Sequence, residues 1–144
     1  MILATKVHEI MTKNVVKISI TDTITDIEHT FRINHLRHAP VCEGERVVGM
    51  ISLLDLRHSL PIVDRDDMEY VEGPNLIASQ IMVADPITLQ SSQPIREAAL
   101  LFSDNEFHAV PVLDGEHIAG IISTTDLIRF MMESIDELET SMAE

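Results

Sequence analysis

The chain carries the stretch GERVVGMISLLDL at residues 44–56 and a second version of it, GEHIAGIISTTDL, at residues 115–127. Both begin with a Gly turn, continue as an apolar run interrupted by one Gly, and end on Ser-x-x-Asp-Leu. A constant shift of 71 residues extends the match without a gap, so that 9–56 aligns with 80–127 at 14 identical positions. Self-similarity at a fixed spacing indicates a repeated structural unit. We therefore predict two copies of one fold.

The sequence pattern predicts the same order of helices and strands in both copies. A helical turn ends at Met11 or Met82, and a short strand follows at 15–18 or 86–89. An amphipathic helix with apolar residues three and four apart comes next, then two strands around a Gly turn, then a second helix. This βαββα order predicts an α/β (α+β) fold of two pseudo-symmetric repeats packed through their small sheets.

Two Asn residues stand at matching places near the end of the amphipathic helix. They are Asn34 in the first copy and Asn105 in the second. Asn tolerates the left-handed conformation that often ends a helix. We therefore expect each of them to adopt it there.

The composition indicates a protein with an aliphatic core. The sequence is 45% hydrophobic but only 3% aromatic, and it has no Trp. The single Cys42 cannot form a disulfide within the chain, and we expect it to be a small buried side chain. No apolar run is long enough to span a bilayer, and the first residues do not resemble a signal peptide. We expect a cytoplasmic protein without a membrane partner.

The negative charge is concentrated in the second half of the chain. The net charge is −14, of which residues 1–57 contribute zero, 58–76 contribute −4 and 77–144 contribute −10. A surface this acidic repels a phosphate backbone, so we expect no nucleic-acid partner. A small phosphorylated ligand would need a locally positive pocket.

The repeats divide the chain into four predicted parts. Residues 6–60 form the first repeat, 61–75 an acidic linker, 76–132 the second repeat and 133–144 a C-terminal helical extension. Apolar residues recur along the last helix at steps of three and four, a stripe that covers either the protein's own core or a partner. The stripe consists of Ile128, Met131, Ile135, Leu138 and Met142.

The repeated features together resemble a pair of CBS domains, known as a Bateman module. They are Ile-Met near the start, a strand with Pro-Val, and Gly-x-Ile-Ser-x-x-Asp-Leu. The resemblance implies two clefts between the copies, which in this family commonly bind adenosine nucleotides, related nucleotides or S-adenosylmethionine. It also implies a module that reports metabolite levels to an effector protein. We expect a stand-alone module that is not an enzyme, requires no cofactor, binds AMP, ADP, ATP or S-adenosylmethionine, and acts on an unidentified effector.

The resemblance places the main cleft on the Ser-x-x-Asp turn of the second repeat. Asp126 would accept hydrogen bonds from ribose hydroxyls, while Ser123 and Thr125 would face phosphate. The first strand of the other repeat would line the base pocket. The implied set is Asn14, Val15, Val16, His108, Ser123, Thr125 and Asp126.

A second, weaker cleft would be the mirror image of the first. The implied set is Arg37, Ser52, Asp55, Pro86 and Ile87. Leu53 and Leu54 stand where the main cleft has Thr124 and Thr125, and Asp85 stands where it has Asn14. Fewer hydroxyls and an added carboxylate disfavour phosphate at this second cleft.

The same residues allow simpler interpretations. A Ser followed three positions later by Asp is typical of a capping box, which closes a helix N-terminus without any ligand. The module would then be a dimerisation or interaction scaffold with empty clefts. His35 and His38 lack the companions of a zinc site, and the Met11 and Met82 pair fits core filling. Arg129 has a structural explanation as an ion-pair partner of Asp126 or Glu133.

Surplus apolar residues on the helices after Ser52 and Ser123 predict a homodimer. They are Leu56, Leu60, Ile128, Met131 and Met132. The resemblance implies that such helices meet at a two-fold interface and form a flat disc of four repeats.

Overall fold

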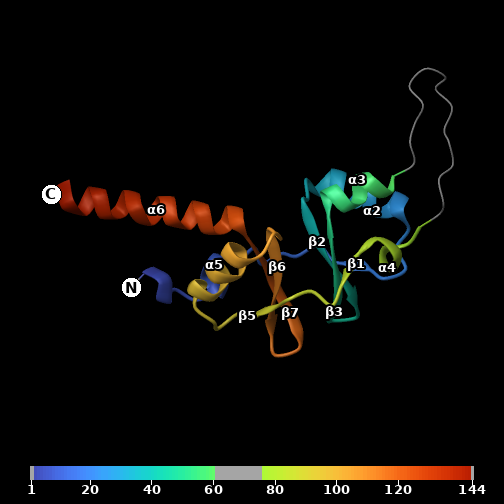
Figure 1. Cartoon of the computed structure of the whole chain (residues 1–144), viewed down its shortest axis with the longest axis horizontal. Coiled ribbons are helices and arrows are strands. Elements are labelled where there is room, and N and C mark those ends of the chain that lie inside the picture. The colour runs from blue at the N-terminus through green and yellow to red at the C-terminus, as the bar shows by residue number, and fades with distance from the viewer. Residues whose placement is uncertain (1, 61–75, 144) are drawn as a thin grey trace, which may run out of the picture. The chain divides into compact units, whose positions relative to one another are not determined.

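The computed structural model describes residues 2–60 and 76–143, which form two compact units (Figure 1). Unit 1 consists of Met1–Val15 and Ile87–Glu144, and unit 2 consists of Val16–Pro86. The predicted acidic linker, 61–75, lies outside the described residues. None of the helices in the described ranges is long and apolar enough to cross a bilayer.

Unit 2 is a four-stranded sheet with its helices. The strands lie in the order β1 (Ile18–Ser19), β2 (His38–Glu43), β3 (Arg46–Ser52) and β4 (Val83–Ala84). Strand β1 is parallel to β2, and the other neighbours are antiparallel. Its helices are α2 (Ile24–Asn34), α3 (Leu53–Ser59) and α4 (Ala78–Ile81).

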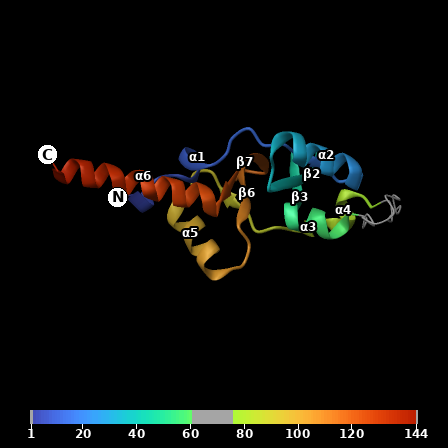
Figure 2. The ribbon, with the colours of Figure 1, turned by 90° about the horizontal axis from the view of Figure 1, so that it is seen from above.

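Unit 1 repeats this plan with a three-stranded sheet. The strands are β5 (Leu89–Gln90), β6 (Ala109–Asp114) and β7 (His117–Ser123), and Thr12 adds an isolated bridge to Ile121 on β7. The helices are η1 (Ile2–Ala4), α1 (Val7–Ile10), α5 (Ile95–Asp104) and α6 (Thr124–Ala143). In both views the C-terminal half of α6 runs on past α5 (Figures 1 and 2).

The two sequence repeats exchange their N-terminal segments. In unit 1, Lys6 bridges Pro94, and the Val7 amide donates to the Gln93 carbonyl at 2.8 Å. The equivalent bridge in unit 2 joins Ile77 to Thr23. Val7 and its equivalent Ala78 are both fully buried in the core of the unit that they enter. Each compact unit therefore contains residues from both repeats.

The predicted first strands are longer and earlier than the observed ones. The sequence predicts strands at 15–18 and 86–89, whereas β1 and β5 begin at Ile18 and Leu89. These are the positions at which a buried apolar side chain pairs with the next strand, Ile18 with Val41 and Leu89 with Val112. In the described structure, the residues before them pair with other strands through the Thr12 bridge and through β4.

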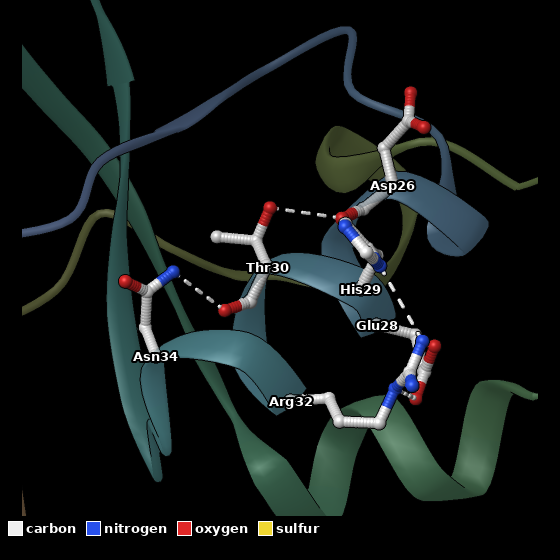
Figure 3. A network of polar contacts seen from close by, with 6 residues as sticks. All are labelled: Asp26, Glu28, His29, Thr30, Arg32 and Asn34. Carbon is white, nitrogen blue, oxygen red and sulfur yellow. Dashed lines mark hydrogen bonds and ion pairs between the residues drawn. The ribbon is translucent and has the colours of Figure 1, made fainter.

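The two Asn residues do not end their helices in the left-handed conformation, so that prediction is wrong. His35 takes this conformation after α2, with φ of 53°, and Asn105 is extended, with φ of −135°. Each Asn side chain instead donates to the carbonyl four residues earlier. Asn34 reaches Thr30 at 2.9 Å, as Figure 3 shows, and Asn105 reaches Leu101 at 2.8 Å. A helix-end carbonyl is thereby satisfied by the side chain.

The hairpins agree with the predicted turns. Gly44 and Gly115 have φ of 62° and 63°, a conformation that disfavours residues with a Cβ. Both hairpins shift register at the same place, between Val41 and Cys42 and between Val112 and Leu113. The repeats are therefore alike in detail as well as in outline.

Candidate functional site

The main candidate site is built where β7 passes into α6. Ser123 is the last residue of β7, and Asp126 lies in the first turn of α6. The Ser123 backbone N–H donates to Asp126 Oδ2 at 2.9 Å, and the Asp126 N–H donates back to Ser123 Oγ at 3.2 Å. The predicted capping geometry is therefore present, and Asp126 has one carboxylate oxygen engaged in it.

The rest of the turn is held by the residue that directly precedes β6. The Thr124 N–H donates to the His108 carbonyl at 2.9 Å, which fixes His108 beside the start of α6. Thr125 is exposed, whereas Ser123 and Asp126 are half-buried. Within the described residues, Asp126 Oδ1 has no hydrogen-bond partner. This oxygen can therefore accept a hydrogen bond from a hydroxyl group such as that of a ribose.

The N-terminal segment, residues 1–15, belongs to the same unit and pairs with β7. The Thr12 N–H donates to the Ile121 carbonyl at 2.8 Å, and Ile121 donates back at 3.0 Å. Asn14 and Val15 follow two and three residues later and belong to unit 1, whereas Val16 begins unit 2. Six of the seven residues implied for the main cleft therefore belong to one compact unit.

The second candidate site has the same skeleton in unit 2. Ser52 and Asp55 form a capping box, with Ser52 N–H to Asp55 Oδ2 at 3.1 Å and Asp55 N–H to Ser52 Oγ at 3.0 Å. The Leu53 N–H donates to the Arg37 carbonyl at 2.7 Å, as Thr124 does to His108. Pro86 ends unit 2, and Ile87 belongs to unit 1.

Asp85 differs from its equivalent, Asn14, in its backbone. It has φ of 49°, and its N–H donates to the Val48 carbonyl at 3.1 Å. The left-handed conformation is uncommon for residues other than Gly, Asn and Asp. The second site thus has an exposed carboxylate on a backbone turn and Leu53 and Leu54 where Thr124 and Thr125 stand in the first.

An open groove of about 530 Å³ lies beside Asp126 within unit 1. Its lining includes three carboxylates and one guanidinium beside two apolar side chains, so its charge disfavours added phosphate groups. The sequence did not indicate this groove, because its walls come from the first residues of one repeat and the last helix of the other. It is lined by Thr5, Glu9, Ile10, Asp126, Arg129, Phe130 and Glu133.

Two structural expectations have different outcomes. Among the described residues Arg129 forms no ion pair with Asp126 or Glu133, so the structure does not support the simpler interpretation of Arg129. Cys42 is buried, with 5% of its surface exposed, as predicted. No group of three His, Cys, Asp or Glu side chains in residues 2–60 and 76–143 is arranged to hold a metal ion.

The family comparison agrees with this architecture. The model of the CBS domain matches the chain twice, at residues 7–61 and 78–133. The chain belongs to the CBS-domain family. It is a tandem CBS pair, as its repeated sequence predicted, and the mixed α/β fold with two small sheets is confirmed.

Relatives of the CBS pair include archaeal proteins. An uncharacterised Methanocaldococcus jannaschii protein, MJ0188, is 30% identical over 132 residues, which are 91% of this chain and 46% of MJ0188. This chain therefore spans about half the length of that relative.

Two solved structures show the same fold with ligands bound. The CBS pair of protein MJ0100, in complex with 5′-methylthioadenosine and S-adenosyl-L-methionine, has a TM-score of 0.74 and 20% identity, covering 91% of this chain and 98% of that chain. CBSX2 of Arabidopsis thaliana, in complex with AMP, has a TM-score of 0.74 and 19% identity, covering 90% and 97%. At these identities the likeness concerns the fold.

Proposed function

We propose that this CBS pair is a regulatory module that binds an adenosine-type nucleotide or a related metabolite at the Asp126 site and signals its occupancy to a partner protein. The observation that carries the proposal is the turn Ser123–Asp126. It combines three hydroxyls with a carboxylate that keeps one oxygen available, beside His108 and the incoming N-terminal segment. A module of this kind binds its ligand without transforming it.

The ligands of the similar structures support an adenosine compound. They are AMP in one case and 5′-methylthioadenosine with S-adenosylmethionine in the other. The charge around Asp126 favours the members of this class that carry few or no phosphates, since Glu9 and Glu133 share the groove with the lone Arg129. The Asp55 site, with Leu53 and Leu54 in its turn, is the weaker of the two.

One observation favours the scaffold alternative. Both Asp55 and Asp126 already accept hydrogen bonds from the Ser three residues earlier, which is sufficient to explain their presence. On that alternative the clefts stay empty, and the module acts only through contacts with other chains.

A thermal-shift panel separates the two functions. The panel contains AMP, ADP, ATP, GTP, NAD, S-adenosylmethionine and 5′-methylthioadenosine, each at a saturating concentration. A ligand at a hundred times its dissociation constant stabilises the folded state by about 2.7 kcal/mol. We expect a clear rise in melting temperature with an adenosine compound and none with GTP. An unchanged melting temperature with every compound would overturn the proposed ligand-binding function and support the scaffold alternative.

A further inference from the structure

The last part of α6 lies beyond the repeated fold. The match to the CBS domain ends at residue 133, whereas α6 continues to Ala143. Every side chain from 135 to 143 is exposed, and both views show this half of the helix running past α5 (Figures 1 and 2). Residues 134–143 are called the α6 extension below. Its large apolar side chains are Ile135, Leu138 and Met142, which are 51%, 53% and 86% exposed.

These three side chains share one face of the helix. They are three and four residues apart, the spacing of positions that contact a neighbouring helix. In proteins, most of the stability of a helix comes from packing of its apolar face rather than from the propensity of its residues. A partner that covers this face would therefore stabilise the α6 extension.

Acidic residues lie beside this apolar face on one side. With 3.6 residues per turn, Glu139 and Asp136 flank it on that side, and Ser134 and Ser141 flank it on the other. The acidic residues of α6 after Arg129 are Glu133, Asp136, Glu137 and Glu139, and no basic residue follows Arg129 in the described helix. Complementary charges at the rim of an interface favour the right partner and disfavour one of like charge. The α6 extension therefore favours a partner with Lys or Arg along one side of its own apolar face.

A second α6 does not provide these cations. It carries the same acidic flank, so two α6 extensions side by side would add negative charge to negative charge. The first repeat has no equivalent face within the described residues. Its helix α3 spans only Leu53–Ser59, and Leu56, expected to be surplus apolar surface, is 1% exposed in the core of unit 2.

The α6 extension is continuous with the candidate ligand site. Asp126 lies in the first turn of α6, and Ile135 follows on the same helix, about 14 Å further along at ~1.5 Å per residue. A single rigid element therefore joins the Ser123–Asp126 turn to the exposed apolar face. Such an element can couple two sites that bind different molecules.

We infer that the α6 extension binds a basic amphipathic helix of another protein. The apolar face of that helix packs on Ile135, Leu138 and Met142, and its Lys or Arg residues lie opposite Asp136 and Glu139. The inference rests on the proposed function in one respect, that a signalling module needs a partner, and the binding itself requires no ligand at Asp126. One helix face is a small interface, below about 1,200 Å² in total, so we expect a transient complex.

A synthetic peptide tests the apolar part of this surface. The probe is a fluorescein-labelled helix about three heptads long, with Leu at the a and d positions and Lys along one flank. Its binding to the full chain is measured by fluorescence anisotropy. Ile135→Gln combined with Leu138→Gln should weaken binding at least tenfold, and Gln retains the helix propensity of these positions. Leu54→Gln, at a residue 61% exposed on α3, is the matched control and should change nothing. Equal affinity in the two variants would overturn the inference.

Neutralised carboxylates test the acidic part. Asp136→Asn with Glu139→Gln should weaken peptide binding about fivefold at low salt, as expected for two exposed ion pairs. The matched control is Glu97→Gln with Glu106→Gln, which removes the same charge from exposed positions of unit 1 outside α6. It should change the affinity less than about twofold, because charges at a distance are screened. A peptide with Glu in place of every Lys should not bind. Equal losses in the two double variants, or binding of the Glu peptide, would overturn the basic partner.

Sedimentation equilibrium tests the other occupant, a second copy of the chain. The wild type and the Ile135→Gln, Leu138→Gln variant should have the same mass in solution. A wild-type dimer that dissociates in this variant would show that a second copy covers the α6 extension, and would overturn the inference. A thermal shift with AMP reports on the proposed function separately. Failure of the Lys peptide to bind a chain whose melting temperature still rises with AMP would overturn the docking surface alone.

Discussion

Met11 lies directly over Gly120 in unit 1. A Cβ at Gly120 would come within 2.6 Å of the Met11 Sδ and equally close to the Thr12 carbonyl oxygen. The equivalent pair in unit 2 is Met82 over Gly49, where every close atom belongs to the flexible Met82 side chain. The repeated Met and the repeated Gly are therefore a contact pair, in which the N-terminal segment of one repeat lies across a strand of the other.

This difference predicts unequal effects of the same substitution. Gly120→Ala should lower the free energy of unfolding by about 1–3 kcal/mol, because the backbone at Thr12 must move. Gly49→Ala should cost less, since Met82 can change rotamer. Urea unfolding followed by circular dichroism measures both, as the chain has no Trp. Equal losses would show that the Thr12 backbone yields as easily as a side chain.

The left-handed His35 predicts a stabilising substitution. His35→Gly should raise the free energy of unfolding by about 1 kcal/mol, since the left-handed conformation costs a residue with a Cβ roughly that much. Asn105→Gly is the matched control, because Asn105 is extended and its side chain bonds to Leu101. It should destabilise. A loss of stability in His35→Gly would contradict the assigned cap.

Burial raises the pKa of the Cys42 thiol, and the nearby Lys17 and Glu45 act in opposite directions on it. The folded state therefore keeps the proton above the ordinary thiol pKa of about 8.5, while the unfolded state loses it. Stability contributed by the neutral thiol is complete below that pH and is lost as the pH rises through the raised pKa. Between pH 7 and pH 10, the wild type should lose more stability than Cys42→Val. Parallel pH dependence in both chains would argue against this effect.

The acidic surroundings of Asp126 predict an order of affinities among adenosine nucleotides. AMP should bind at least tenfold more tightly than ATP, because each added phosphate meets the field of Glu9 and Glu133. Calorimetric titration at low and at physiological salt measures the difference, which should shrink as salt screens the charges. Tighter binding of ATP would mean that the phosphates meet cations outside this groove.

The sequence predicts the repeated fold because its signals are local. Gly44 and Gly115 set the hairpins, and Ser52 and Ser123 begin the second helices. Each of these residues acts on neighbours within a few positions, so a single sequence contains the whole signal. The ends of α2 and α5 differ from the prediction because the Asn side chains bond to carbonyls four residues earlier. After α2, His35 adopts the left-handed conformation, and the Asn34 side-chain amide donates to the Thr30 carbonyl.

The site could be predicted only in part. Ser123 and Asp126 are bonded as their spacing indicates, but the groove beside them depends on α1 docking against α6. That contact joins residues more than a hundred positions apart, for which the repeat gives no local signal. The exposure of the α6 stripe is similar, since spacing predicts a shared face but not whether the protein's own core covers it.

The asymmetry between the two candidate sites is the central claim, and paired alanine variants test it most directly. Asp126→Ala and Asp55→Ala both remove a capping box, so both should lose about 1 kcal/mol of stability. Only the first should also lose ligand, because a charge-assisted hydrogen bond is worth roughly 1.5–3 kcal/mol. Calorimetric titration with AMP and with S-adenosylmethionine should show at least tenfold weaker binding for Asp126→Ala and little change for Asp55→Ala. Equal losses in the two variants, or a larger loss for Asp55→Ala, would contradict the assignment.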